Sequence, residues 1–314
     1  MATDENQAIY RRFVDDIIND GRYELIPELF DAGYTDHSAP PGAPGGFAGV
    51  EAVFRMFRGG FPDVHFTIQT MLSEGDKVAT RVTGSGTHGG AFMGIPPSGK
   101  QATWASHGIF RVRDGRIVEH WGQPDILALL AQIGGIPASA GIGPPLDTSH
   151  LRTRPDIPPP DPHDPALLEA HRHAVGWVHD TAFSAGDVSL AARYVAADYV
   201  DHPPARPYNV ALSGPASLTE TVAAFRVAFP DLVTRCEDVV ADGNRVAARA
   251  MWTGTHRGDF FGIAPTGKTF AVEGISFFRF DGDQFVEGFG TWDAVAFMQQ
   301  LGMMPGPDAT RDER

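Results

Sequence analysis

Apolar residues recur along the chain with two periods, one typical of helices and one typical of strands. Ile9, Phe13 and Ile17 follow one another at intervals of one helical turn, which predicts a helix over residues 7–20. Gly21, directly after this stretch, is a typical helix end. Farther on, four stretches alternate apolar and polar side chains or are rich in β-branched residues, and they predict consecutive strands at residues 64–72, 76–88, 101–112 and 116–123.

Shorter elements complete this pattern. A second helix is expected at residues 23–30 and a short strand from Tyr34, which runs into prolines. A third helix carries the apolar stripe Val50, Val53, Phe54 and Phe57, and a last one covers roughly 125–133. Because the long strands follow one another, they favour an antiparallel sheet with helices gathered on one face, which is an α+β fold.

The same pattern occurs twice. The segment GTHGGAFMGIPPSGK at 86–100 returns as GTHRGDFFGIAPTGK at 254–268, and adding 168 pairs every position between 61 and 125. Along that register 23 of 65 positions are identical, which indicates a duplicated domain. Closer to the N-terminus, the two copies are paired by adding 165 instead, so that Gly21 pairs with Gly186 and Tyr34 with Tyr199. We therefore expect domains at residues 1–135 and 166–314, joined by a proline-rich linker at 136–165.

Composition excludes several classes of function. The net charge is −14 and no block of Lys or Arg occurs, which argues against nucleic acid or an anionic membrane as partner. Cys236 is the only cysteine, no long apolar run is present, and the start of the chain has no signal-like segment, so we expect a cytoplasmic protein. The chain has 12 histidines but no metal-ligand spacing and no phosphate-binding loop, so we expect no metal and no cofactor.

Several motifs carry a family resemblance. They are Asp-His-Pro at 201–203, Phe-Pro-Asp at 61–63, the Gly-Thr-His to Gly-Lys stretch, and Val-Glu-His-Trp at 118–121. With these motifs the chain resembles the SnoaL-like polyketide cyclases, also called ester cyclases, of the nuclear-transport-factor-two-like superfamily.

The resemblance implies two tandem cone-shaped domains, each a cystatin-like α+β barrel with helices packed on a curved antiparallel sheet around a deep apolar pocket. It also implies an intramolecular pseudo-dimer, with further homo-oligomers left open. The implied activity is an aldol ring closure on a small apolar or aromatic substrate without metal or cofactor.

The last strand departs from the family pattern. The acid/base Asp that the family carries there is replaced by Gly122 and Gly290. By spacing, His107 falls at the position of the family's pocket histidine, although a shift of one residue would point it out of the pocket. The second copy has Ile275 there. These departures weaken the prediction of a standard aldol cyclase.

Three histidines are the catalytic candidates, namely His120, His37 and His107. His120 lies two residues before Gly122, so both share one face of the strand, and its counterpart in the second copy is Gly288. An imidazole titrates near neutral pH, and an apolar pocket would lower its pKa and keep it a neutral base. His37 ends the first strand near the expected pocket mouth, or merely caps that strand. The first domain is therefore expected to carry any activity.

Other residues are candidates for substrate contact, each with a structural alternative. His88 and His256 either contact the substrate or brace a hairpin. Glu273 is either a surface residue or a buried acid with a raised pKa. Asp125 and Asp293 look like helix N-caps, although Asp293 could replace the lost carboxylate. The candidates for substrate binding are Trp104, His88, Trp121, His202, His256, Glu273, Trp292 and Asp293.

Three functions stay open at this point. The chain is a cofactor-free cyclase, isomerase or hydrolase, a binding protein with two pockets, or a catalytic domain supported by an inactive copy. The two glycines favour the second and third alternatives, whereas the histidines and aromatic residues favour a working pocket in at least one domain.

Overall fold

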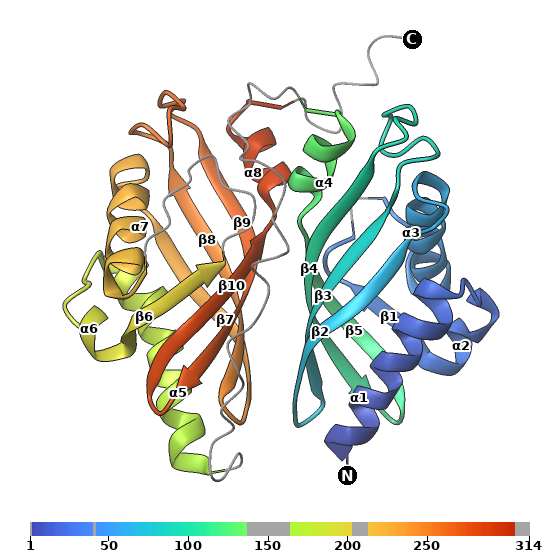
Figure 1. Cartoon of the computed structure of the whole chain (residues 1–314), viewed down its shortest axis with the longest axis horizontal. Coiled ribbons are helices and arrows are strands. Elements are labelled where there is room, and N and C mark those ends of the chain that lie inside the picture. Colours follow the sequence, from blue (N-terminus) through green and yellow to red (C-terminus); the bar gives the residue numbers. More distant parts are fainter. Residues whose placement is uncertain (1, 40–41, 137–163, 203–212, 305–314) are drawn as a thin grey trace. The chain divides into compact units, whose positions relative to one another are not determined.

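The computed structural model of the chain describes residues 2–39, 42–136, 164–202 and 213–304. It divides into two compact units, Met1–Ala140 and Gly141–Arg314, which we call domain 1 and domain 2. In each domain, helices pack against one face of a five-stranded sheet (Figure 1). The linker predicted at 136–165 lies outside the described residues except at its ends.

Domain 1 follows the predicted order of elements. Its first helix is an α-helix that continues without a break as a π-helix. The elements are α1 (Ala2–Arg12), η1 (Phe13–Asn19), η2 (Tyr23–Leu25), α2 (Ile26–Leu29), β1 (Phe30–Asp36), α3 (Gly46–Gly60), β2 (His65–Glu74), β3 (Lys77–Thr87), β4 (Gln101–Arg113), β5 (Arg116–Pro124) and α4 (Ile126–Ile133).

Domain 2 repeats this order, as the internal similarity predicts. It too begins with an α-helix that runs on as a π-helix. The elements are α5 (Pro165–Gly176), η5 (Trp177–Phe183), α6 (Ala191–Tyr194), β6 (Val195–His202), α7 (Pro215–Ala228), β7 (Val233–Asp242), β8 (Arg245–Thr255), β9 (Thr269–Asp281), β10 (Gln284–Trp292) and α8 (Ala294–Gln300).

The sheets are mixed rather than purely antiparallel. Their strand orders are β1-β5-β4-β3-β2 and β6-β10-β9-β8-β7. The four long strands are antiparallel, as predicted, but β1 pairs in parallel with β5 and places Asp36 opposite His120. Since β1 and β2 are opposite edges of the sheet that the structure describes, it is open and not a closed barrel.

Each π-helix is held to an edge strand by the residue that follows or ends it. In domain 1, the side chain of Asn19 donates to the carbonyl of Phe66 at 3.0 Å and accepts from its amide at 2.7 Å. In domain 2, the hydroxyl of Ser184 donates to the carbonyl of Thr234 at 2.9 Å and accepts from its amide at 2.7 Å. The two copies thus reach the same anchorage with different side chains.

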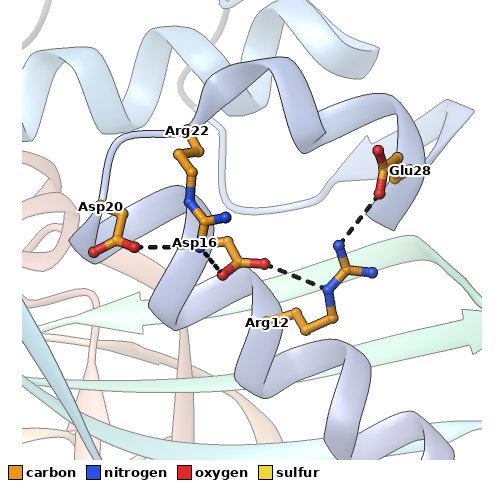
Figure 2. A network of polar contacts seen from close by, with 5 residues as sticks. All are labelled: Arg12, Asp16, Asp20, Arg22 and Glu28. Carbon is orange, nitrogen blue, oxygen red and sulfur yellow. Dashed lines mark hydrogen bonds and ion pairs between the residues drawn. The ribbon is translucent and has the colours of Figure 1, made fainter.

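A charged network joins the first helix to the short helices that follow it. Figure 2 shows Arg12 between Asp16 and Glu28, with N–O distances of 3.3 and 3.2 Å, and Arg22 between Asp16 and Asp20. Most of these side chains are exposed, so each pair contributes only about 0–1 kcal/mol to stability. Together they link Arg12 and Asp16 of the first helix to Glu28 of α2 and to Arg22.

The two cores place one large indole on different strands. In domain 1, Trp104 of β4 is fully buried and stacks on Phe57 at 5.8 Å, while its partner on β3 is Gly84. In domain 2 the same cross-strand pair is Trp252 on β8 and Val272 on β9. A Cβ atom on Gly84 would lie 2.5 Å from Cε2 of Trp104, so the indole occupies the space over a bare backbone.

Candidate active site in domain 1 and cavity in domain 2

The helix-covered face of the first sheet carries a histidine and a carboxylate side by side. Phe110 of β4 marks this face, because its ring packs on Tyr10 and Phe13 of the first helix. His120 of β5 stacks on Phe110 with a centroid distance of 4.2 Å and an interplanar angle of 18°. Nδ1 of His120 lies 3.3 Å from Oδ1 of Asp36, which the parallel pairing of β1 brings opposite.

Two glycines make room for this imidazole. A Cβ atom on Gly122 would lie 2.4 Å from Cε1 and 2.6 Å from Nε2 of His120. A Cβ atom on Gly108 would lie 3.2 Å from the same Nε2. The position that lacks the family's carboxylate is therefore filled by the ring of His120, and any side chain at Gly122 would displace it.

The electrostatics suit a base with a fixed partner. Burial acts to raise the pKa of Asp36, yet hydrogen bonds from His120 and Ser38 hold that pKa below its ordinary value. Asp36 is therefore an ionised carboxylate at neutral pH. Burial and the charge of Asp36 raise the pKa of Tyr34 far above its usual range, so this neighbouring phenol stays protonated. The side chains of His120 and Asp36 are 20% and 22% exposed, so a bound molecule can reach them.

The same wall in domain 2 lines a cavity and has no imidazole. Gly288 stands in place of His120, and the hydroxyl of Tyr199 lies 2.2 Å from where its Cβ would be. The cavity has a volume of about 180 Å³ and is lined by residues of the sheet, of α7, of η5 and of α8. Asp201, the counterpart of Asp36, lines it, and so does His179 from the π-helix.

His37 and His202 lie away from these walls. His37 is exposed and stacks on Trp121 at 4.5 Å, and Trp121 follows His120 on β5, so both lie on the opposite face of the sheet. His202 stacks in the same way on Phe289, and its Nε2 lies 3.0 Å from Oε1 of Glu287. The structure therefore does not bring His37 to His120.

His107 and Glu273 also lie on the opposite faces of their sheets. His107 is buried next to Gly108 on β4, and because Gly108 faces His120, the His107 side chain points the other way. Glu273 follows the same alternation on β9 beside Gly274, which lines the cavity, and it is ion-paired with Arg249. Neither residue joins the candidate site.

His88 and His256 brace the loop between the second and third long strands of each domain. Nδ1 of His88 lies 3.0 Å from the hydroxyl of Ser98 and accepts from the Ser98 amide. His256 contacts Thr266 through the same atoms, and burial lowers the pKa of His256. Both rings are fully buried, which agrees with the structural alternative of a braced hairpin.

The remaining candidates divide between core, cavity and helix cap. Trp104 is enclosed by Phe57, Phe61 and Phe66, so its ring is part of the core. Trp292 lines the cavity of domain 2. The expected N-caps are confirmed: Oδ1 of Asp125 accepts from the Ala128 amide, and Asp293 caps α8 in the same way.

Sequence reasoning missed two residues. Asp36 could have been found from alternation, because Tyr34 is an inward-facing aromatic and Asp36 lies two residues beyond it on the same strand. His179 could have been found from the repeat, because offset 165 pairs it with Val14, and a histidine opposite a valine marks a place where the copies diverged.

Among the residues that the structure describes, no three His, Cys, Asp or Glu side chains are grouped so that they could hold a metal ion. Within the same ranges, no helix is long and apolar enough to cross a membrane.

An open five-stranded mixed sheet with helices on one face, present twice, defines a tandem α+β protein. Residues 8–133 and 174–301 both match the SnoaL-like polyketide cyclase family, and the chain belongs to that family with two tandem copies of its domain. This is a fold on which cofactor-independent cyclases and isomerases are built. No curated protein matches the chain.

Solved structures with similarity to the chain each match a little over two fifths of it. TsrD from Streptomyces laurentii is 28% identical, with 42% of this chain and 96% of TsrD covered and a TM-score of 0.40. IdmH from Streptomyces antibioticus is 35% identical, with coverages of 41% and 98% and a TM-score of 0.38. A SnoaL-like polyketide cyclase from Agrobacterium tumefaciens is 20% identical, with coverages of 41% and 98% and a TM-score of 0.36.

Proposed function

We propose that the chain is a cofactor-independent acid–base enzyme that removes a proton beside the carbonyl of a small apolar or aromatic compound. The reaction takes place in domain 1, and His120 is the base. The observation that carries this proposal is the pair formed by His120 and Asp36 on the helix-covered face of the sheet, 3.3 Å apart and partly accessible.

The geometry assigns a role to each nitrogen of the ring. An ionised Asp36 beside Nδ1 favours the tautomer with the proton on Nδ1, which leaves the lone pair on Nε2 to accept a proton. When the proton moves from the carbon to Nε2, the electron pair of the C–H bond passes into the enolate. The imidazolium formed is stabilised by the Asp36 carboxylate, and it returns the proton when the enolate has reacted.

Domain 2 has a different part in this proposal. Its last strand carries Gly288 and Gly290 where domain 1 has His120 and Gly122, so it lacks the base. It supports domain 1 or binds a molecule of its own. We include a cytoplasmic location in the proposal, supported by the single cysteine of the sequence.

The proposal can be tested without the natural substrate. β-Tetralone is a bicyclic ketone that contains a benzene ring and has acidic protons beside its carbonyl, and NMR in deuterated water follows their exchange. The full chain is expected to accelerate this exchange, and His120→Ala is expected to lose at least ~10²-fold of the rate, the usual scale for a general base. Asp36→Asn should retain more activity than His120→Ala and should change the pH dependence of the exchange rate, because the carboxylate acts through His120.

His202→Ala is the control, since it removes an imidazole of domain 2 that ends β6, the counterpart of β1, and stacks on Phe289. It should leave the rate unchanged. Equal losses from His120→Ala and His202→Ala, or exchange that is unaffected by His120→Ala, would contradict the proposal and favour a binding protein.

A further inference from the structure

The cavity of domain 2 has the walls of a site for a flat aromatic molecule. Its volume of about 180 Å³ is slightly larger than the roughly 150 Å³ of an apolar cavity that holds benzene. Half of the 20 residues that line it are Phe, Tyr or Trp, and their rings offer both faces and edges for stacking. The aromatic residues that line it include Phe183, Phe225, Trp252, Phe260 and Phe278.

Two polar side chains in this wall, those of His179 and Thr291, have buried polar atoms without a hydrogen-bond partner among the described residues. His179 lines the cavity, is 2% exposed, and neither of its ring nitrogens is hydrogen-bonded to the described residues. Burial lowers the pKa of His179 to about 4, so the ring is neutral and offers one donor and one acceptor. A buried polar group without a partner is rare in native proteins and calls for a ligand or another explanation.

The position of His179 is rigidly set. It lies in the π-helix η5, and its carbonyl accepts a hydrogen bond from the hydroxyl of Thr234 on β7, the strand to which Ser184 anchors this helix. Its ring meets Trp252 edge to face at 5.9 Å and 87°. Single π-helical segments are frequent at functional sites because they reposition a side chain relative to an α-helix.

The two domains carry their polar group on opposite walls. At the helix position domain 1 has Val14, which is buried, and domain 2 has His179. At the sheet position domain 1 has His120 and domain 2 has Gly288. The imidazole of His179 is therefore not the counterpart of His120. It would contact a bound molecule from the helix side, whereas His120 would contact one from the sheet side.

We propose that domain 2 contains a separate binding site for an uncharged, flat aromatic molecule that bears a hydroxyl group, with His179 as its hydrogen-bond partner. A hydroxyl both donates and accepts, as neutral imidazole does. Asp201 lines the same cavity and disfavours an anionic ligand, and the apolar walls disfavour any charged one. The site does not depend on catalysis in domain 1, and its test measures binding only.

Phenol and toluene form a matched pair of probes, because they have nearly the same shape and differ in one hydroxyl. Toluene is the more hydrophobic, so a purely apolar cavity would prefer it. Affinities are measured by ligand-detected NMR on the full chain carrying His120→Ala, which removes the imidazole of domain 1. This protein is expected to bind phenol at least ~10-fold more tightly than toluene. That is the scale expected when a ligand pairs a buried polar group that would otherwise have no hydrogen bond.

Adding His179→Leu should reverse this preference, with phenol affinity reduced ~10-fold or more and toluene binding retained. Retained toluene binding shows that the cavity is intact. His179→Gln, which keeps a donor and an acceptor, should restore part of the phenol preference. The inference is overturned if the protein with His179 prefers toluene or binds neither probe, or if His179→Leu leaves the affinity for phenol unchanged.

Discussion

Replacing His179 by leucine should flatten the pH dependence of stability. The pKa of His179 falls from an ordinary value of 6.5 to about 4 because burial disfavours the charged ring. The unfolded chain therefore binds a proton at this residue between pH 6.5 and 4, while the folded chain does not. Stability is lost as the pH falls through this window, and the loss is complete below the folded-state value.

The size of the effect follows from these two pKa values. Between pH 7 and pH 5 the unfolded chain gains most of a proton at His179 and the folded chain almost none, which corresponds to about 2 kcal/mol of lost stability. His179→Leu removes this contribution. The free energy of unfolding of the wild type should therefore fall by about 2 kcal/mol more than that of the variant over the same pH interval.

Urea unfolding at pH 7 and pH 5, followed by circular dichroism and by tryptophan fluorescence, measures this difference. Val178→Ala is the matched control, because Val178 lines the same cavity but cannot titrate. It should lower the free energy of unfolding by similar amounts at both pH values. If the wild type and His179→Leu lose the same free energy of unfolding on acidification, the conclusion that His179 is buried and neutral is refuted.

Two further predictions concern glycine and ion-pair positions. Gly122→Ala should displace the ring of His120, lower the rate of proton exchange ~10-fold or more and destabilise domain 1 by ~1–3 kcal/mol, as seen by NMR and thermal unfolding. Gly290→Ala in domain 2 should be tolerated, because the nearest atom to its Cβ would be Oγ of Ser276 at 3.6 Å. Glu287→Ala should cost ~3–5 kcal/mol in urea unfolding, since Arg279 is only 5% exposed and lies 2.9 Å from that carboxylate. The equivalent Glu119→Ala should cost ~1 kcal/mol or less, because its partner Arg111 is 23% exposed; equal costs would contradict the burial argument.

The fold could be predicted almost completely from the sequence, because the repeat and the two hydrophobic periods are local or nearly local signals. The parallel pairing of β1 with β5 could not be predicted in this way. These strands are separated by α3 and the three other strands, and nothing in either segment specifies its neighbour. The partnership of Asp36 with His120 depends on that pairing, so it was hidden as well.

The candidate site shows a second limit of sequence reasoning. The sequence predicts His37 near the pocket mouth or as a strand cap, and in the Asp-His dipeptide only one of the two side chains can face the helix-covered side. The structure places Asp36 on the helix-covered face and His37 on the other. His179 escaped notice because it lies in a π-helix, where the period of an α-helix no longer tells which residues face inward.

The core indole lies on β4 in domain 1 and on β8 in domain 2, so corresponding strands of the two domains cannot replace one another freely. Suppose that recombination between the copies moved the third strand of domain 2 into domain 1 without the fourth. The chimaera would bring Trp252 against Trp104, and the reciprocal product would leave Gly84 opposite Val272 with no indole at all. One product is overfilled and the other contains a void, and each costs several kcal/mol, on the scale of ~1–5 kcal/mol for such core changes. A crossover within this pair of strands is thus selected against, which helps a tandem duplication to keep two different pockets.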